Sequence, residues 1–402
     1  MEEDVRRYAR GFDARVPELA AAAQRCPGLA RRLAEDGVEP GELTDVASLD
    51  RLPVLTKDQL LELQRLDPPF AGMVADDAAI RRVFQSPGPL YEAEPDVPDP
   101  WRWAPALRAA GIGETDLVLN AFGYHLSPAG AMFEEAARAV GARVVPGGVG
   151  NADLQLDACL DLGVTAYVGL PSYLGSLLER AEERGLVDQL AISRAFVTAE
   201  PLPPGLRRQL EERVAVVRQG YGTAETGNLG FESAAQDGLH VPADALVQIC
   251  DLTTGEARYD GGEGQVVVTV FSADAPVVRF GTGDLSAWAM DATSSEVPTP
   301  RIRGWLGRVG DAVKVRGMFL HPRQIDAVMG GVDEVERYRF VIERAGHRDE
   351  LRCEVVAGSD RDEALADRIA RLVKDGLRFN ADVRFVDHLD DDRTLVDERD
   401  WS

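Results

Sequence analysis

The chain has 402 residues, with 44 lysines and arginines against 68 aspartates and glutamates, which gives a formal net charge of −24. Hydrophobic residues make up 45% of it, so it can bury a sizeable core, and a chain of this length usually forms about two or three domains. The negative charge repels nucleic-acid phosphates and anionic lipid, and no Lys/Arg-rich run offsets it. We therefore expect no nucleic-acid partner.

The sequence carries no sign of export, membrane insertion or a metal ribbon. Acidic residues follow the first methionine where a signal peptide needs basic ones, and no run of about 18 apolar residues could span a bilayer. No two cysteines form a C-x-x-C pair, so neither a disulfide framework nor a zinc ribbon is predicted. We expect a cytoplasmic protein without a membrane partner. Its cysteines are Cys26, Cys159, Cys250 and Cys353.

Apolar residues three and four positions apart predict helices over residues 14–66. Thr56 is placed to cap one of them, because its hydroxyl can accept a hydrogen bond from a free backbone N–H. Over residues 80–290, short β-branched runs alternate with helical stretches rich in Ala, Leu and Glu. This alternation predicts βα units on a largely parallel sheet.

After residue 306 the pattern changes to strand, helix, two strands, a long amphipathic helix and a final strand. The predicted fold class is α/β, with a large N-terminal domain over residues 1–306 of mostly parallel sheets and flanking helices. A small, mobile α+β domain covers residues 307–402. Gly310 can absorb a large φ/ψ change, so we place a hinge there, with an ordinary turn glycine as the alternative.

The first motif that could carry chemistry is the segment 220–226, GYGTAET, which follows the apolar strand VAVV. It should lie at the carboxyl end of that strand, where α/β sheets bind ligands. Its glycines allow close approach of a ligand, Tyr221 offers a flat face for a base, and Glu225 offers a hard oxygen for Mg²⁺. A purely structural turn is the alternative.

Two further motifs follow along the chain. In RFGTGD, Asp284 comes after a tight glycine turn and could accept two hydrogen bonds from a ribose diol; an Asp-capped hairpin is the alternative. The segment GRVGDAVKVRG indicates a strand entering the small domain, with Lys314 and Arg316 on one face. Each motif is weak alone, and their order and spacing carry the information.

Taken in order, YGTAE, RFGTGD and GRVGDAVKVRG resemble the successive adenylate-binding motifs of the adenylate-forming superfamily. Within it, the chain is most similar to the phenylacetate-CoA ligase-like proteins. The resemblance runs over nearly the whole chain through LDRLPVLTKDQL, NAFGYHLSPAG, GARVVPGGVGN, TAEPLPP and LVDERDW.

This resemblance implies a large domain that holds acid and ATP and a small domain that rotates between two half-reactions. In the first, a carboxylate attacks the α-phosphate of Mg·ATP to give an acyl-adenylate and pyrophosphate. In the second, the thiol of coenzyme A displaces AMP. The implied cofactors are therefore ATP or AMP, Mg²⁺ and coenzyme A.

By position, the resemblance also implies roles for single residues. Tyr221 would stack on adenine, Glu225 would hold Mg²⁺, and Asp284 and Arg308 would take the ribose hydroxyls. Gly310 would be the pivot of the small domain. The implied nucleotide-binding set is Tyr221, Gly222, Thr223, Glu200, Asp284, Arg308 and Lys314. The implied acid pocket comprises Phe122, Tyr124, His125, Gly148 and Gly150. A gating role for Tyr124 and His125 stands beside plain packing as the alternative.

The phosphate loop departs from the family. Relatives have a Ser/Thr/Gly-rich loop ending in lysine, whereas residues 86–94 here read SPGPLYEAE. Two prolines remove N–H donors, and Glu92 places a negative charge where relatives have a positive one. At about 4 Å and an effective dielectric constant of about 20, one unit-charge contact is worth roughly 4 kcal/mol, so we expect weak triphosphate capture.

The second departure is the missing catalytic lysine near the C-terminus. Relatives carry a lysine before the closing segment that matches LVDER, but no lysine follows Lys374 here. Loss of such a group costs about 10² to 10³ in rate, unless Arg393 has taken over its role. Arg393 is therefore a candidate catalytic residue together with Glu225.

Metal and partner expectations follow from the same comparison of motifs. Some relatives hold a structural zinc through cysteines, and of such a set only His240 remains here, so we expect no zinc and only transient Mg²⁺. The expected partners are a small-molecule carboxylic acid and a nucleotide. Because relatives often dimerise, a homodimer is a further expectation.

Three functional hypotheses remain at this point. The first is an acid:CoA ligase, or acid-adenylating enzyme, that acts on an aryl acid with an altered phosphate loop. The second is a non-catalytic descendant that binds AMP, an acyl-adenylate or an aromatic metabolite. The third is a partial enzyme that runs only the thioester half-reaction.

Overall fold

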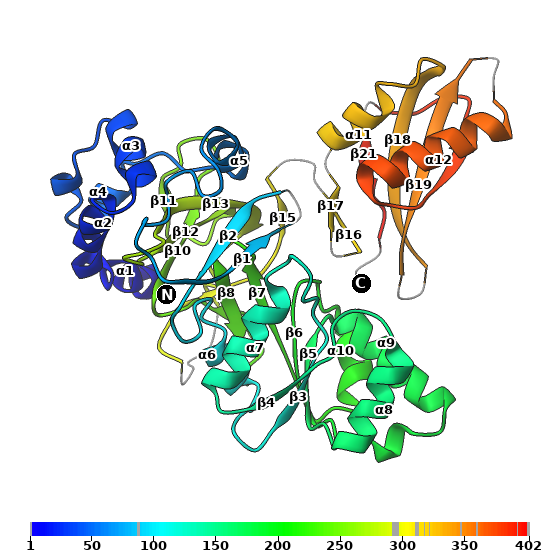
Figure 1. The fold of residues 1–402 in the computed structure, drawn as a ribbon, viewed down its shortest axis with the longest axis horizontal. Coiled ribbons are helices and arrows are strands. Elements are labelled where there is room, and N and C mark those ends of the chain that lie inside the picture. The colour runs from blue at the N-terminus through cyan, green and yellow to red at the C-terminus, as the bar shows by residue number, and fades with distance from the viewer. Residues whose placement is uncertain are drawn as a thin grey trace. The chain divides into compact units, whose positions relative to one another are not determined.

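The computed structural model describes residues 2–86, 89–291, 297–309, 313–316, 318–320, 322–345, 348–358, 361–391 and 393–399. Contacts separate the chain into two compact units, residues 1–307 and residues 308–402. Figure 1 follows the chain through both units. Gly310 lies outside the described residues, so the hinge and the mobility of the C-terminal domain stay predictions.

The first unit begins with short helices around an apolar cluster that includes Leu19, Leu33 and Phe271. As predicted, Thr56 caps one of these helices. Its hydroxyl accepts from the Gln59 N–H at 3.2 Å, and the Gln59 side chain accepts from the Thr56 N–H at 2.8 Å. The helices are α1 (Glu2–Arg10), α2 (Val16–Ala23), α3 (Pro27–Glu35), α4 (Val46–Leu49) and α5 (Lys57–Leu66).

An eight-stranded sheet of order β14-β9-β8-β7-β6-β5-β3-β4 forms the α/β part of this unit (Figure 1). Strands β3 to β7 are parallel with helices between them, which confirms the α/β fold class. Strands β8, β9 and β14 continue it antiparallel. The strands are β3 (Leu117–Asn120), β4 (Arg143–Pro146), β5 (Ala166–Gly169), β6 (Arg194–Val197), β7 (Val216–Thr223), β8 (Gly227–Glu232), β9 (Leu239–His240) and β14 (Arg301–Ile302). The helices are α6 (Ala104–Ala109), α7 (Ala129–Ala139), α8 (Ala152–Leu162), α9 (Pro171–Glu183) and α10 (Pro204–Glu211).

A second sheet of this unit has the order β11-β10-β12-β13-β15, and its first four strands pair antiparallel. The parallel alternation predicted up to residue 290 therefore ends at β7. A buried strand such as β12 reads the same in either kind of sheet, because both of its faces are apolar. A hairpin of β1 (Ile80–Gln85) and β2 (Tyr91–Pro95) stands beside these sheets. The second sheet comprises β10 (Ala245–Cys250), β11 (Ala257–Arg258), β12 (Gly264–Val270), β13 (Val277–Ser286) and β15 (Gly307–Arg308).

The second unit is a small α+β body with its own core. Its four-stranded sheet has the order β20-β19-β18-β21, and its buried side chains include Phe340, Cys353 and Ile369. Asp362 caps the long helix by accepting from the Leu365 N–H at 2.8 Å. The elements are β16 (Val313–Val315), β17 (Met318–Leu320), α11 (Pro322–Met329), β18 (Val335–Ala345), β19 (Arg348–Ala357), α12 (Glu363–Leu377), β20 (Ala381–Phe385) and β21 (Leu395–Asp397).

The turn between β7 and β8 is closed so tightly that it requires glycine. A Cβ atom on Gly222 would lie 2.3 Å from the carbonyl oxygen of Gly227 and 2.6 Å from the ring of Trp103. Gly227 itself has φ +71°, a conformation that L side chains rarely adopt. Packing alone therefore accounts for glycine at position 222, whatever its part in ligand binding.

Gly222→Ala should lower the free energy of unfolding by about 1 to 3 kcal/mol, because the added methyl group must displace a backbone carbonyl and a buried indole. The matched control is Gly205→Ala in α10, where a Cβ meets no atom within 4 Å. This control should be neutral or stabilising by roughly 0.5 to 1 kcal/mol. Urea unfolding followed by tryptophan fluorescence measures both, and equal midpoints for the two variants would contradict the packing argument.

Candidate functional site

Two of the three sequence motifs meet inside the first unit. Tyr221, on β7, donates its hydroxyl hydrogen to Oδ2 of Asp284, on β13, at 2.9 Å. The same hydroxyl lies 3.3 Å from the Thr282 hydroxyl, and Asp284 is only 4% exposed. The segments YGTAE and RFGTGD, far apart in sequence, thus place an aromatic ring and a buried carboxylate side by side.

The other oxygen of Asp284 also has a partner. The indole N–H of Trp305 donates to Asp284 Oδ1 at 3.2 Å, while the Trp305 side chain stays partly in solvent, with 41% of the residue exposed. Sequence reasoning missed Trp305, which lies between β14 and β15 and is one of few tryptophans. Asp284 therefore already accepts hydrogen bonds on both oxygens, as a residue that binds a diol must.

Glu225, in the turn between β7 and β8, is paired with a lysine from the N-terminal helices. The ammonium nitrogen of Lys57, the first residue of α5, lies 2.5 Å from Glu225 Oε1, and the two side chains are 27% and 8% exposed. Burial would raise the pKa of Glu225, but Lys57 outweighs it and holds that pKa below its ordinary value. Sequence reasoning missed this role of Lys57, although its scarcity, as one of three lysines, was a signal.

A second carboxylate lies near this ion pair. Glu92, on β2 opposite Phe84 of β1, is 8% exposed, and neither of its oxygens makes a hydrogen bond of ordinary geometry. Burial raises the pKa of Glu92 to about 8, Glu225 adds to the rise, and Ser86 and Lys57 oppose it. The sequence predicted Glu92 as a negative charge in an altered phosphate loop. Within that loop Pro87 and Gly88 lie outside the described residues, so the loop's effect on phosphate stays a prediction.

The expected acid-pocket aromatics differ in their surroundings. Phe122 is 7% exposed and stacks on Phe133 with ring centroids 4.9 Å apart, as part of a buried aromatic cluster. Tyr124 is half-buried, its hydroxyl accepts from the Asn120 amide at 2.8 Å, and burial raises its pKa. His125 is exposed. Their contact with an acid, and any gating motion, stay predictions.

The glycine run that was expected to line the acid pocket is held by one buried side chain. The amide nitrogen of Gln155, on α8, donates to the carbonyl oxygens of Gly147, Gly148 and Gly150, each at 3.0 Å. The Tyr173 hydroxyl donates to Gln155 Oε1 at 2.9 Å and so fixes which way the amide points. Sequence reasoning missed Gln155, because a glutamine inside an amphipathic helix gives no signal of its own.

Glu200 is also held in one orientation. The Ser172 hydroxyl, at the start of α9, donates to Glu200 Oε2 at 2.5 Å. Glu200 follows the end of β6, beside the strand that carries Tyr221. This places it at the same edge of the sheet as the YGTAE motif.

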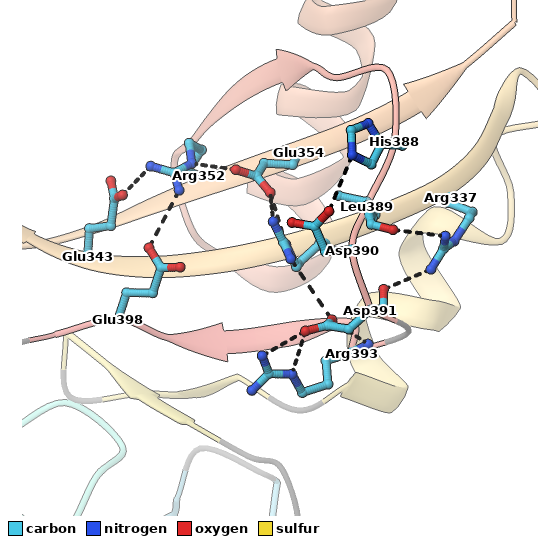
Figure 2. A network of polar contacts seen from close by, with 11 residues as sticks. Arg337, Glu343, Arg352, Glu354, His388, Leu389, Asp390, Asp391, Arg393 and Glu398 are labelled. Atoms are coloured by element: carbon cyan, nitrogen blue, oxygen red, sulfur yellow. Dashed lines mark hydrogen bonds and ion pairs between the residues drawn. The ribbon is translucent and has the colours of Figure 1, made fainter.

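The remaining candidates belong to the second unit, which begins at Arg308, the last residue of β15. Arg308 lies on β15 and is half-buried. Lys314 lies on β16, and its side chain is not among the parts that the structure describes. Arg393 is 68% exposed, and its Nε and Nη2 both donate to Asp391 Oδ2, at 2.9 and 2.7 Å (Figure 2). Figure 2 also shows Asp391 close to a ladder of arginines and glutamates on β18 and β19. A catalytic role for Arg393 therefore requires it to exchange Asp391 for a phosphate.

Among the described residues, no group of three or more His, Cys, Asp or Glu side chains is arranged to hold a metal ion. His240 is buried, with Nδ1 2.9 Å from the Thr299 carbonyl oxygen. In the part of the chain that the structure describes, no helix is both long and apolar enough to traverse a bilayer.

No protein-family model matches the chain, but individual relatives do. It is 29% identical to a phenylacetate-coenzyme A ligase of Thermus thermophilus over 395 residues, which covers 89% of this chain and 87% of the relative. A phenylacetate-coenzyme A ligase of Escherichia coli is 25% identical over 354 residues, covering 84% and 79%. The resemblance found in the motifs is thus confirmed over most of the sequence.

Solved structures give the same picture of the fold. A 2-hydroxyisobutyryl-CoA ligase in complex with 2-HIB-AMP and CoA matches with a TM-score of 0.85 at 25% identity, covering 98% of this chain and 91% of that one. The amide bond synthetase McbA from Marinactinospora thermotolerans matches in fold alone, with a TM-score of 0.57 at 19% identity and coverage of 77% and 66%.

The raised pKa of Glu92 predicts a pH-dependent stability. The folded chain keeps this proton up to about pH 8, whereas an unfolded glutamate loses it near pH 4.3, so between these values the folded state binds more protons. The free energy of unfolding therefore falls as the pH rises through this window. Glu92→Gln lacks this titrating group, so the stability of the variant relative to the original chain should rise by about 4 kcal/mol between pH 5 and pH 9.

Urea unfolding in EDTA at pH 5, 7 and 9 measures this difference. The control is Glu62→Gln on α5, whose side chain is 65% exposed and should show no such trend. A stability difference between Glu92→Gln and the original chain that is constant across the three pH values would contradict the prediction.

Proposed function

From its position as a divergent relative of the phenylacetate-coenzyme A ligases, we propose that this chain is an acid:CoA ligase. It would convert a carboxylic acid of the aryl type and ATP into an acyl-adenylate, and then form the thioester with coenzyme A. The observation that carries the proposal is the hydrogen bond between Tyr221 and Asp284, because it joins two adenylate motifs into one cradle. Similarity to relatives over at least 84% of the chain in the compared sequences supports it.

The proposed nucleoside site follows from the hydrogen bonds that Asp284 already accepts. A ribose diol offers two O–H donors, which would replace the N–H of the partly exposed Trp305 and add to the Tyr221 hydroxyl. The Tyr221 ring would stack on the base, bordered by Glu200 in the orientation that Ser172 fixes. Gly222 and Thr223 would bring the backbone close to the nucleotide, and Arg308 and Lys314 would contribute from the second unit.

Glu225 offers a buried carboxylate of the kind that Mg²⁺ prefers, so the residue present fits the cation. Bound Mg²⁺ would supply positive charge to the phosphates. Because the Lys57 ammonium already lies 2.5 Å from Glu225 Oε1, Glu225 would bind the cation through Oε2 or release Lys57. Glu225 is thus proposed to change partners when nucleotide binds.

The acid is proposed to lie against Gly148 and Gly150, near Phe122, Tyr124 and His125. The Gln155 hydrogen bonds hold the glycine loop in a fixed shape, which favours selection of the acid by fit. Coenzyme A is part of the same proposal and is supported by the relatives. A cytoplasmic location and a homodimer stay predictions.

A second candidate function is favoured by the ion pairs of the two residues that are expected to act on the triphosphate, Glu225 and Arg393. Lys57 neutralises Glu225, and Asp391 neutralises Arg393, so both groups expected to act on the triphosphate are engaged elsewhere. A protein of this kind would bind AMP or an acyl-adenylate. It would run only the thioester half-reaction, or serve as a binder of an aromatic metabolite.

Calorimetry with AMP and with ATP, together with pyrophosphate release over a panel of aryl acids, separates the two candidates. A ligase should bind both nucleotides and release pyrophosphate with at least one acid. AMP binding without ATP binding and without pyrophosphate release would favour the second candidate. Asp284→Asn should weaken AMP binding at least tenfold, because an amide cannot accept on both of its ends. The control Asp188→Asn, at a side chain that is 94% exposed, should bind AMP normally, and normal binding by Asp284→Asn would refute the ribose assignment.

The role of Arg393 has a test of its own. If it stabilises the charge on the α-phosphate, Arg393→Ala should slow acyl-adenylate formation about 10²-fold and leave the thioester step from supplied acyl-adenylate unchanged. The matched control is Arg384→Ala on β20, since Arg384 is similarly exposed and pairs with Asp382 two residues away. Equal rates of ATP–pyrophosphate exchange in the two variants would remove Arg393 from the catalytic set.

A further inference from the structure

One amide group holds three carbonyl groups of the glycine run that is proposed to border the acid. Gln155, on α8, is 4% exposed, and its Nε2 lies 3.0 Å from the carbonyl oxygens of Gly147, Gly148 and Gly150. A primary amide has two hydrogens, so the three acceptors share them. Carbonyl oxygens that converge on one point repel one another, so this donor is what makes such a turn of the loop possible.

The Gln155 amide is also fixed in its direction. The Tyr173 hydroxyl, on α9, donates to Gln155 Oε1 at 2.9 Å and lies 3.2 Å from the carbonyl oxygen of Gly150. If the amide were flipped, its oxygen would face three carbonyl oxygens, which carry no hydrogen to donate. Both ends of this buried side chain bind protein groups, so its effect on a ligand passes through the loop.

The glycine loop has few other contacts that would select its shape. Gly148 has φ +69° and Gly150 has φ +83°, and a Cβ atom on either would meet no atom within 4 Å beyond its chain neighbours. Glycine reaches such conformations as readily as many others, so the backbone alone does not choose them. Val149, between these glycines, is 77% exposed, so its packing adds little. The hydrogen bonds from Gln155 therefore do most to select this shape.

The glycine loop is joined to the second loop that is proposed to border the acid, residues 122–125. Asn120, the last residue of β3, is 1% exposed, and its carbonyl oxygen accepts from the Gly148 N–H at 3.1 Å. The Asn120 side-chain amide donates to the Tyr124 hydroxyl and to the Gly130 carbonyl oxygen, each at 2.8 Å. A change in the shape of the glycine loop should therefore reach the loop that carries Tyr124.

We propose that Gln155 is a positioning residue that determines which acids the site accepts. This inference rests on the proposed function, in which Gly148, Gly150 and Tyr124 border the acid. It goes further than that function, because it assigns the choice of acid to a side chain that does not touch the acid. A rigid wall rejects an acid of the wrong shape, whereas a wall that can move admits that acid and binds the right one less well.

Gln155→Met keeps the length of the side chain and removes both its donor and its acceptor. The variant should raise the KM for the best acid about tenfold, because the loop no longer holds the shape that fits this acid. Its KM for ATP should stay within about twofold, because the hydrogen bond between Tyr221 and Asp284 does not involve the loop. The ratio of kcat/KM between the best and the poorest acid should fall about tenfold. Tyr173→Phe should act in the same direction by a smaller factor.

Pyrophosphate release measures these constants over a panel of aryl acids that includes benzoate, phenylacetate and 3-phenylpropionate. The control is Gln209→Met, at an exposed glutamine of α10, which should keep all of the constants. In Gln155→Met, hydrogen exchange of a peptide that contains residues 147–151 should become faster. Unchanged exchange over the rest of the first unit shows that this variant is folded.

Three results would overturn the inference alone in a chain that is active. They are a selectivity ratio in Gln155→Met equal to that of the original chain, a KM for ATP that rises as much as the KM for the acid, and unchanged exchange at residues 147–151. An original chain that releases pyrophosphate with none of the acids would overturn the proposed function, and this inference with it.

Discussion

The structure of the candidate site depends on how two buried acidic side chains share one ammonium: Lys57 pairs with Glu225 and lowers its pKa, while burial raises the pKa of Glu92 to about 8. The fold imposes this arrangement, because α5, the β1-β2 hairpin and the β7–β8 turn each fix one of the three side chains. The Lys57 ammonium lies on Glu225 Oε1, so a cation that arrives with a nucleotide would have to compete with it for this carboxylate. Tyr221 and Asp284 have hydrogen bonds of their own, separate from this ion pair.

Much of the fold could be predicted from the sequence. The alternation of β-branched and helical stretches gave the parallel strands, and the changed pattern after residue 306 gave the small α+β unit. The antiparallel sheet around β12 could not be separated from the parallel one, because both bury their strands on two faces. Strand direction depends on long-range pairing, which a local pattern does not encode.

Only part of the site could be predicted from the sequence, because its contacts also join residues that lie far apart along the chain. Motifs named Tyr221, Glu225 and Asp284, and the structure brings the first and last together. Lys57 was noticed only as a rare residue, since nothing local links the start of α5 to a turn far along the chain. Glu92 was interpreted as repulsion toward phosphate, and its burial beside another carboxylate became visible only in three dimensions.

The most direct measurement of the central claim is the titration of the Glu92 carboxyl, followed by carbon-13 NMR of the full chain, with Glu92→Gln used to assign its signal. The account predicts a pKa of about 8 for Glu92, because this carboxyl is buried near Glu225 while the Lys57 ammonium pairs with Glu225. A pKa near the ordinary value of a glutamate, about 4.3, would contradict it.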